Sequence, residues 1–201
     1  MSMKIEQPGG HIDQLIRQTR WQHAQLSAMA DIKANVLLTI STITLSFCVP
    51  YVGTPMLQWP ALVMIICCVL TAFASILVLS PKLPPRGAVA SKRGTGFNIL
   101  FFGSFADMEQ EEYLREIEAI CNEPSRVYET MAKDIYILGR FLAKVKYFYL
   151  RLGYQLFIAG LFASGLTFAF VELAINLGID VWVIHFGLQD YTPLVPPSPT
   201  P

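Results

Sequence analysis

Four basic side chains between positions 82 and 93 form the group in this sequence that is best suited to binding an anion. A segment rich in glycine and proline carries them, at Lys82, Arg86, Lys92 and Arg93. Backbone N–H groups at the following Gly94 and Gly96 could help to hold a phosphate, although SKRGTG lacks the spacing of a P-loop. The same side chains could instead attract anionic lipid headgroups, and the sequence by itself favours that alternative. They are candidate ligand-binding residues for a phosphate or a lipid.

Charged side chains also lie where an apolar segment begins. Asp31 and Lys33 directly precede an apolar run that starts at Ala34. Asp31 could pair with a base such as Arg151 or Lys146 and latch two helices together. Alternatively, Asp31 stays solvated while Lys33 extends its long side chain to the lipid headgroups. The pattern gives Asp31, Lys33 and Arg151 as candidate gating or latch residues.

Glu172 is a carboxylate close to the C-terminal end of another apolar segment. Because a charge inside a bilayer is costly, a carboxylate there suggests a functional role, in conduction or in packing. Near the end of a helix the side chain can also reach the interface, so a purely interfacial position is equally open. Glu172 therefore joins the candidate gating residues.

Patterns typical of catalysis or metal binding do not occur in this sequence. HExxH, GxSxG and paired cysteine ligands are missing, and the histidines are scattered, at His11, His23 and His185. Three of the four cysteines lie in apolar stretches, where reduced cysteine acts as a small apolar filler. We therefore predict no catalytic residue, no metal site and no enzymatic activity.

The segments that must position these residues are mostly apolar. Hydrophobic residues make up 53% of the chain and charged residues 15%, whereas a globular domain carries about 25% charged residues. Three stretches have the roughly 20 apolar residues that a membrane-spanning helix needs, at 34–52, 61–80 and 152–175. They lack the alternation of barrel strands. The first two form a transmembrane hairpin, 34–81, because an uncharged loop of eight residues joins them.

The basic residues predict the orientation of these spans. All 15 Lys and Arg residues lie either before the first span or between the second and the third, and the hairpin loop and the C-terminal tail have none. Cytoplasmic segments carry such an excess of basic residues. We therefore expect residues 1–33 and 82–151 in the cytoplasm and the C-terminus on the extracytoplasmic side.

The remaining segments predict mainly helix. Apolar residues recur at helical spacing in the cytoplasmic segment 1–33, so we expect an amphipathic helix there. The apolar segment NILFFGSF (98–105) is either a short strand or an apolar plug against the helices. No proline occurs from position 125 to 175, which favours one long helix that continues into the third span, 152–175. Residues 176–201 form an interfacial segment and a disordered proline-rich tail.

The predicted fold class is therefore an all-α membrane protein with three transmembrane helices. Its cytoplasmic helical region consists of the N-terminal helix, the 82–151 insertion and the long helix that is continuous with the last span.

Three stretches resemble the transmembrane effectors of bacterial Pycsar antiphage systems. ADIKANVLL (30–38) resembles the Asp-x-Lys-Ala sequence with which the first span of that family begins. NILFFGSFADMEQEEYLREI (98–117) is similar to its Asn-x-x-Phe-Phe-Gly block and the acidic helix that follows. DIYILGRFLAKVKYFYLRLGYQLFIAGL (134–161) resembles the long helix that leads into its last span.

This resemblance implies a function. In such systems a cyclase makes cyclic CMP or cyclic UMP upon phage infection, and a membrane-spanning effector responds by disrupting the inner membrane. The sequence contains no recognisable cyclic-nucleotide-binding domain, so the cytoplasmic helices and the loop at 82–105 would have to recognise the ligand, between protomers. The expected partners are the lipid bilayer, a cyclic pyrimidine nucleotide, further copies of the chain in a homo-oligomer and, functionally, a pyrimidine nucleotide cyclase.

The resemblance places the protein in the bacterial inner membrane and implies neither a cofactor nor a nucleic-acid partner. A different class of function also fits the sequence. The chain could be a non-gated membrane scaffold or adaptor that anchors a cytoplasmic partner through the helices at 105–150.

Overall fold

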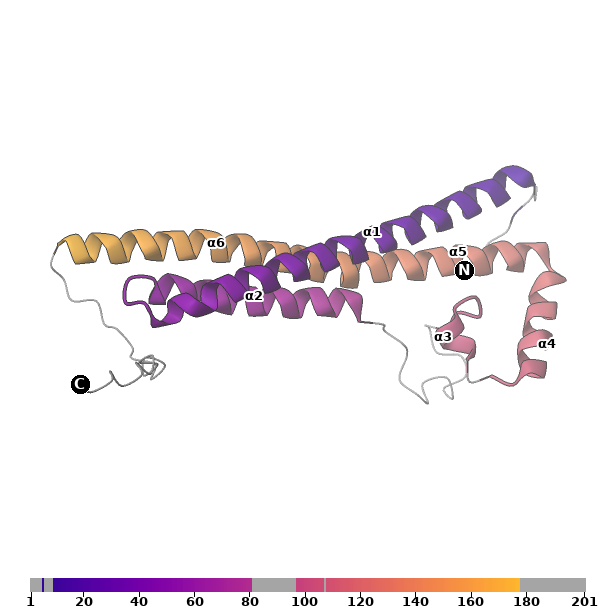
Figure 1. The fold of residues 1–201 in the computed structure, drawn as a ribbon. Helices are drawn as coiled ribbons and strands as arrows, with labels where there is room; N and C mark the ends of the chain where they lie inside the picture. The colour runs from indigo at the N-terminus through magenta and orange to yellow at the C-terminus, as the bar shows by residue number, and fades with distance from the viewer. Residues whose placement is uncertain (1–4, 6–8, 81–96, 107, 178–201) are drawn as a thin grey trace, which may run out of the picture. The chain divides into compact units, whose positions relative to one another are not determined.

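The computed structural model of the chain describes residues 5, 9–80, 97–106 and 108–177, and every regular element in these ranges is helical (Figure 1). The elements are α1 (Gly10–Cys48), the 3₁₀ helix η1 (Val49–Gly53), α2 (Gln58–Leu79), α3 (Phe102–Phe105), α4 (Gln110–Cys121), α5 (Pro124–Phe141), the π-helical turn η3 (Leu142–Lys146) and α6 (Tyr147–Asn176). No strand occurs among the described residues. The prediction of an all-α fold is confirmed.

Three helical runs are long and apolar enough to cross a membrane, which confirms the predicted number of spans. They are Gly10–Gly53, Gln58–Leu79 and Pro124–Asn176. The first α-helix ends at Cys48, and Pro50 occupies the first turn of the 3₁₀ helix that follows, where its missing N–H is tolerated. The second span begins at Gln58 rather than at Ala61, because a proline such as Pro60 is also compatible with the first turn of a helix.

The chain divides into two compact units. Unit 1 comprises Met1–Ala34 and Leu77–Leu150, and unit 2 comprises Asn35–Ile76 and Arg151–Pro201. Arg151 and Glu172 are the charged residues within 35–76 and 151–177, so all other charged residues of the described chain lie in unit 1. Charged groups are costly in an apolar environment, and this division separates the apolar part of each long helix from its polar part.

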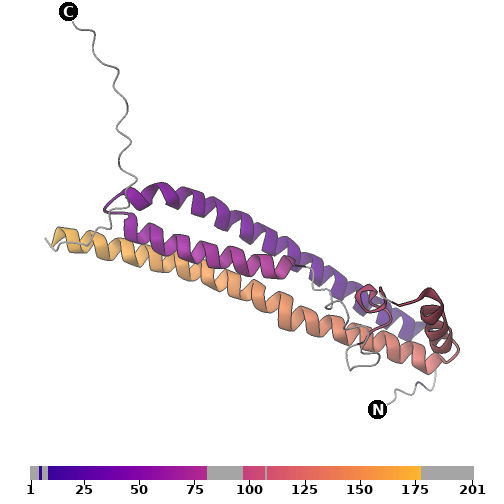
Figure 2. The ribbon, with the colours of Figure 1, turned by 90° about the horizontal axis from the view of Figure 1, so that it is seen from below.

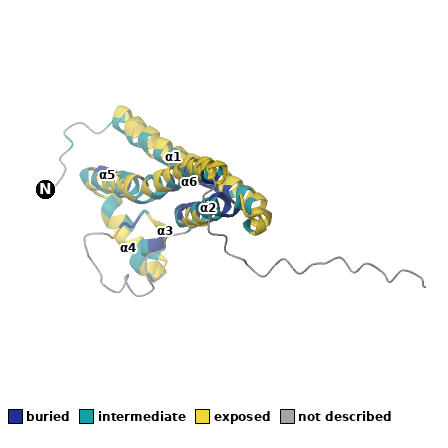
Figure 3. Cartoon of the chain, turned by 90° about the vertical axis from the view of Figure 1, so that its left-hand side faces the viewer, coloured by how far each residue is buried: buried dark blue, intermediate teal, exposed yellow. Residues whose placement is uncertain are grey.

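Unit 2 consists of the apolar parts of α1, α2 and α6, which lie side by side (Figures 1 and 2). Its outward faces are exposed (Figure 3). They are apolar, and on α6 they carry large side chains at i, i+4 and i+8, namely Phe162, Leu166 and Phe170. A contiguous exposed apolar surface of this kind is unusual in a soluble protein and is suited to contact with lipid. The buried residues of α2 between positions 68 and 75 are all small.

Glycine permits the close approach of the helices in unit 2. A Cβ atom at Gly153 would lie 2.9 Å from Leu37 Cδ2 and 3.6 Å from Ala74 Cβ, so α6 meets both α1 and α2 at this position. A Cβ atom at Gly160 would lie 2.5 Å from Cys67 Cβ. Membrane helices pack closely at such small residues because their association depends on van der Waals contact.

Most hydroxyl side chains of unit 2 donate their hydrogen bond to a backbone carbonyl of their own helix. Ser41 donates a hydrogen bond to Leu37 O at 2.8 Å and Ser75 donates one to Thr71 O at 2.9 Å, each four residues back. This arrangement lets a buried hydroxyl lie in an apolar surrounding without an unpaired proton. Ser164 instead donates across to α2, to Pro60 O at 3.0 Å, and so adds a polar contact between two spans.

Unit 1 contains the first part of α1, the end of α2, and the elements from α3 to the start of α6. Its buried apolar cluster is small and consists of Ala30, Ala34, Val78 and Leu150. α4 begins with Glu111 and Glu112 in its first turn, where carboxylates interact favourably with the helix dipole. Pro124 lies in the first turn of α5, where proline is well tolerated.

Two sequence expectations for unit 1 change. The segment NILFFGSF is not a strand: it contains the short helix α3, buries Ile99 and Gly103 and leaves Phe101 and Phe102 exposed, so it fits the plug alternative only in part. The long helix runs without a break from Pro124 to Asn176, as expected, but it contains the π turn η3 at Leu142–Lys146. Such a wide turn shifts the register of the side chains that follow it. The predicted basic loop at 82–96 and the tail at 178–201 lie outside the described residues.

Candidate functional site

A buried carboxylate at Asp134 organises the polar part of unit 1. Its side chain is 10% exposed and has two partners on different segments. Asn98 Nδ2 donates to Asp134 Oδ1 at 2.6 Å, and Arg20 Nε lies 3.2 Å from Asp134 Oδ2. A buried carboxylate requires such partners, since an unpaired one would carry a large desolvation penalty. The three residues therefore join α1, the segment before α3 and α5.

The Asn98 side chain is itself fixed by the backbone. The N–H of Leu100 donates to Asn98 Oδ1 at 3.0 Å, so the amide can present its NH₂ group only toward Asp134. Asn98 is buried, and its oxygen and one amide proton are both used. This contact positions the 97–106 segment against α5 through a polar group rather than through apolar packing alone.

A cavity of about 590 Å³ lies beside this cluster. Its walls come from α1, α5 and the start of the 97–106 segment, and the lining residues are Asp13, Ile16, Arg17, Arg20, Trp21, Ala24, Leu100, Met131 and Asp134. Sites for small molecules have volumes of about 300–1,000 Å³ and combine apolar walls with a few polar groups. This cavity offers two guanidinium groups, one indole and two carboxylates.

The edge of the cavity is tied to α5 through Asp13. The hydroxyl of Tyr128 hydrogen-bonds to the Asp13 carboxylate, and Tyr128 is buried on α5. Further along the same pair of helices, a Cβ atom at Gly139 would lie 3.1 Å from His23 Cε1. The first part of α1 therefore packs closely along α5 on both sides of the cavity.

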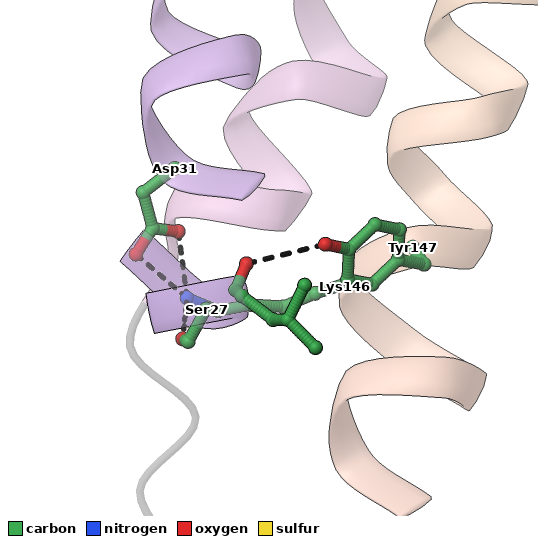
Figure 4. A network of polar contacts seen from close by, with 5 residues as sticks. Ser27, Asp31, Lys146 and Tyr147 are labelled. Carbon is green, nitrogen blue, oxygen red and sulfur yellow. Dashed lines mark hydrogen bonds and ion pairs between the residues drawn. The ribbon is translucent and has the colours of Figure 1, made fainter. Parts of the chain in front are cut away.

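A second polar network lies at the end of the π turn (Figure 4). Lys146 Nζ donates to Asp31 Oδ1 at 2.6 Å, to Asp31 Oδ2 at 2.7 Å and to Ser27 Oγ at 2.9 Å. The adjacent Tyr147 hydroxyl donates to Leu26 O at 3.3 Å. An ammonium group has three protons, and each has an acceptor here. The Lys146 side chain is only 13% exposed and that of Asp31 is 39% exposed.

The structure brings together some of the residues that the sequence singled out. Asp31 pairs with Lys146, one of the two bases considered for it. Arg151, the other base, belongs to unit 2 and is exposed, and Lys33 is exposed as well. Glu172 has one buried oxygen, Oε2, which has no hydrogen-bond partner among the described residues. Their roles in gating or latching remain predictions.

The other group of predicted residues cannot be placed. Lys82, Arg86, Lys92 and Arg93, the candidate ligand-binding side chains, lie outside the described residues. Within the ranges that the structure describes, no group of three or more His, Cys, Asp and Glu side chains is placed to hold a metal ion.

Sequence reasoning missed the cavity and the carboxylate beside it. One available signal was Asp134 itself, which lies at helical spacing among apolar residues of α5, three residues after Met131 and four before Leu138. A charged residue at a position that the helical period assigns to a buried face requires a partner. Asn98, a polar residue before an otherwise apolar run, was the second signal.

We expect Lys146→Met to destabilise the protein by about 1–2 kcal/mol, because Asp31 and Ser27 lose their shared donor while the side chain keeps its apolar length. Removing one partner of a fully buried ion pair has a larger effect, but Asp31 is partly exposed, so water replaces part of the interaction. Thermal unfolding of the protein in detergent, followed by circular dichroism, measures the change.

Lys144→Met is the matched control for that substitution, since Lys144 is exposed and lies on the same turn. Asp31→Asn alone and together with Lys146→Met completes a double-mutant cycle. Equal unfolding temperatures for Lys146→Met and Lys144→Met would show that the network contributes nothing to stability.

The sequence of the chain matches one family. The profile of the Pycsar effector protein domain (PycTM) matches residues 14–171, a range that includes Asp31, Asn98, Asp134 and Lys146. No curated protein and no solved structure matches the chain. Because the family profile covers well over half of the chain, the predicted resemblance is confirmed, and the chain belongs to the Pycsar effector protein family.

Proposed function

We propose that this membrane protein, an effector of bacterial antiphage defence, is activated by a cyclic pyrimidine nucleotide and then impairs the integrity of the bacterial inner membrane. Membership of the Pycsar effector protein family supports the defence role. In this proposal a pyrimidine nucleotide cyclase supplies cyclic CMP or cyclic UMP after infection, and the effector acts on the lipid bilayer rather than on a further substrate.

The observation that carries the proposal is the sharing of helices between the two units. α1 contributes residues 10–34 to the charged unit 1 and residues 35–48 to the apolar unit 2, and the run from α5 to α6 is divided in the same way. A ligand that binds better to one arrangement of α1 and α5 shifts the protein toward that arrangement. Because the same helices continue into unit 2, such a shift acts on elements that span the membrane.

The proposed orientation follows from charge. Basic residues are concentrated in the segments of unit 1, so we propose that unit 1 and the N-terminus are cytoplasmic and that the C-terminus is extracytoplasmic. We also propose a homo-oligomer. Large apolar side chains of α1 in unit 1 are strongly exposed, at Leu15 and Ile32, and a second copy would remove such surface from water.

The proposal predicts that the chain depolarises bacteria only when a cyclic pyrimidine nucleotide is present. The test expresses the full chain together with a pyrimidine cyclase and follows a potential-sensitive dye. We expect loss of membrane potential with the active cyclase and a normal potential with a cyclase whose catalytic carboxylates are replaced. Depolarisation with both cyclases would contradict the nucleotide trigger.

A normal potential with both cyclases, at equal levels of membrane-inserted protein, would contradict membrane impairment. In that case, recovery of a stoichiometric cytoplasmic partner with the intact membrane would support the scaffold alternative instead.

A further inference from the structure

We propose that the cavity between α1, α5 and Leu100 binds a small nucleoside phosphate that carries one negative charge and a ring with an N–H donor. The inference rests on the proposed function for the statement that such a ligand activates the protein, and it adds the site and the role of each side chain. The predicted anion-binding residues at 82–93 have no part in it.

The first argument is the state of the two guanidinium groups in the cavity. Arg20 uses its Nε for Asp134, which leaves the four protons on its two terminal nitrogens for another acceptor. Arg17 lies one turn earlier and has no ion-pair partner within the described part of the chain. Guanidinium groups bind phosphate oxygens with two parallel hydrogen bonds. Two of them at i and i+3 lie on one helix face and line the same cavity, so both can contact a single anion there.

Asp134 has a positioning role in this site. Its two oxygens are used by Asn98 and Arg20, so it does not act as a free carboxylate that would compete with the phosphate for Arg17. It instead holds the Arg20 side chain at the wall of the cavity. A guanidinium that is held in place before binding loses less conformational entropy when the anion arrives.

The second argument is the indole of Trp21. Trp21 is 64% exposed although it lines the cavity, so much of its surface is accessible to a ligand. Aromatic side chains bind nucleobases by stacking, without preference for one base. An indole beside two guanidinium groups therefore selects an anion that also carries a flat ring, over inorganic phosphate.

The third argument is the carboxylate of Asp13. It lies on the cavity wall and is exposed to solvent, and it accepts a hydrogen bond from the hydroxyl of Tyr128 on α5. A carboxylate has room for several hydrogen bonds, and it accepts from the exocyclic amine of cytosine or from a ring N–H. Asp13, Arg17 and Trp21 follow one another at intervals of four residues, so they share one face of α1.

The site can be tested by equilibrium binding to the full chain in lipid nanodiscs at fixed ionic strength. The probes are cyclic CMP, cyclic UMP, 5′-AMP and inorganic phosphate. We expect Arg17→Gln to raise the dissociation constant of the bound cyclic nucleotide by roughly 10- to 100-fold, the range for losing a charge-assisted contact. Trp21→Leu keeps the apolar surface but removes the ring, and it should weaken binding by roughly tenfold or more.

Arg126→Gln is the matched control, because Arg126 is an exposed arginine of α5 outside the cavity. Its dissociation constant should equal that of the wild type. If the wild type binds cyclic CMP or cyclic UMP and both Arg17→Gln and Trp21→Leu bind equally well, the site is overturned while the proposed function stands.

The other outcomes test the cyclic pyrimidine trigger and the binding role of the cavity separately. Binding of 5′-AMP alone, with the same dependence on Arg17 and Trp21, would support the cavity and overturn the cyclic pyrimidine trigger. Binding of none of the probes by correctly folded wild type would overturn both. Inorganic phosphate binding as tightly as the nucleotides would contradict the role of the indole.

Discussion

Gly160→Val should destabilise the protein by about 3 kcal/mol, because valine introduces side-chain atoms where α6 and α2 are in direct contact. A Cβ atom at position 160 would already lie 2.5 Å from Cys67 Cβ and 3.2 Å from Cys67 Sγ. The Cβ atom of Cys67 is fixed by the helix backbone, so it cannot rotate away as the end of a long side chain could. The helices must separate to admit the new atoms, and neighbouring contacts such as Ser164 with Pro60 O would be strained.

Gly165→Val provides the comparison on the same helix. Gly165 is exposed, and a Cβ atom there would meet nothing within 4 Å. Valine also has a higher helix propensity than glycine, so this variant should be as stable as the wild type or slightly more stable. Thermal unfolding in detergent, followed by circular dichroism, measures both.

A second variant pair tests the contact itself. Combining Gly160→Ala with Cys67→Gly adds a methyl group on α6 and removes the facing side chain on α2. The double variant should therefore recover much of the stability that Gly160→Ala loses. Equal unfolding temperatures for Gly160→Val and Gly165→Val would mean that α2 and α6 do not pack as the structure has them.

Asp134→Ala should reduce the unfolding free energy by about 2–4 kcal/mol, because two polar groups lose their partner at once. The Asn98 amide is buried and its NH₂ group would point into a small void, while Arg20 would lose the carboxylate that orients it. Asp134→Asn should have a smaller effect, since its carbonyl oxygen can still accept from Asn98. Chemical denaturation monitored by the tryptophan fluorescence of the full chain gives the differences.

Glu116→Ala is a suitable control for that pair, because Glu116 is an exposed carboxylate on α4. Its stability should equal that of the wild type within about 0.5 kcal/mol. If Asp134→Ala is no more destabilising than Glu116→Ala, the polar cluster does not hold the 97–106 segment to α5.

The parts of this fold that sequence predicted are those that depend on local pattern. Three apolar runs of sufficient length identify the spans, and the charge distribution places nearly all charged residues outside them. Arg151, which the sequence placed with the cytoplasmic residues 82–151, belongs to unit 2 in the structure. The pairing of Asp31 with a base of the long helix could be proposed, because Asp31 lies just before the first predicted span and Lys146 and Arg151 lie just before the third. Choosing between them required the structure, because Lys146 ends a π turn that the sequence did not predict, and such a turn shifts the register of the side chains.

Other features depend on contacts between distant residues. Asn98 and Asp134 are 36 positions apart, and no periodicity in either segment indicates that they meet. The cavity depends on how α1, α5 and Leu100 pack, although Arg17, Arg20 and Trp21 occupy one face of a helix that the sequence did predict. The pattern of a single amphipathic helix shows which face is buried. It does not show which polar groups on that face meet a hydrogen-bond partner on another segment.

Leakage from proteoliposomes is the most direct test of nucleotide-triggered membrane impairment. The purified full chain is reconstituted in vesicles that enclose a self-quenching dye, and cyclic CMP or cyclic UMP is added to the face that exposes unit 1. Nucleotide should release the dye from vesicles that contain the wild type and should leave protein-free vesicles intact. Vesicles that contain Arg17→Gln should need a nucleotide concentration roughly 10- to 100-fold higher for the same release. Dye release that is the same with and without nucleotide, or no release by wild-type protein that binds the nucleotide, would contradict the account.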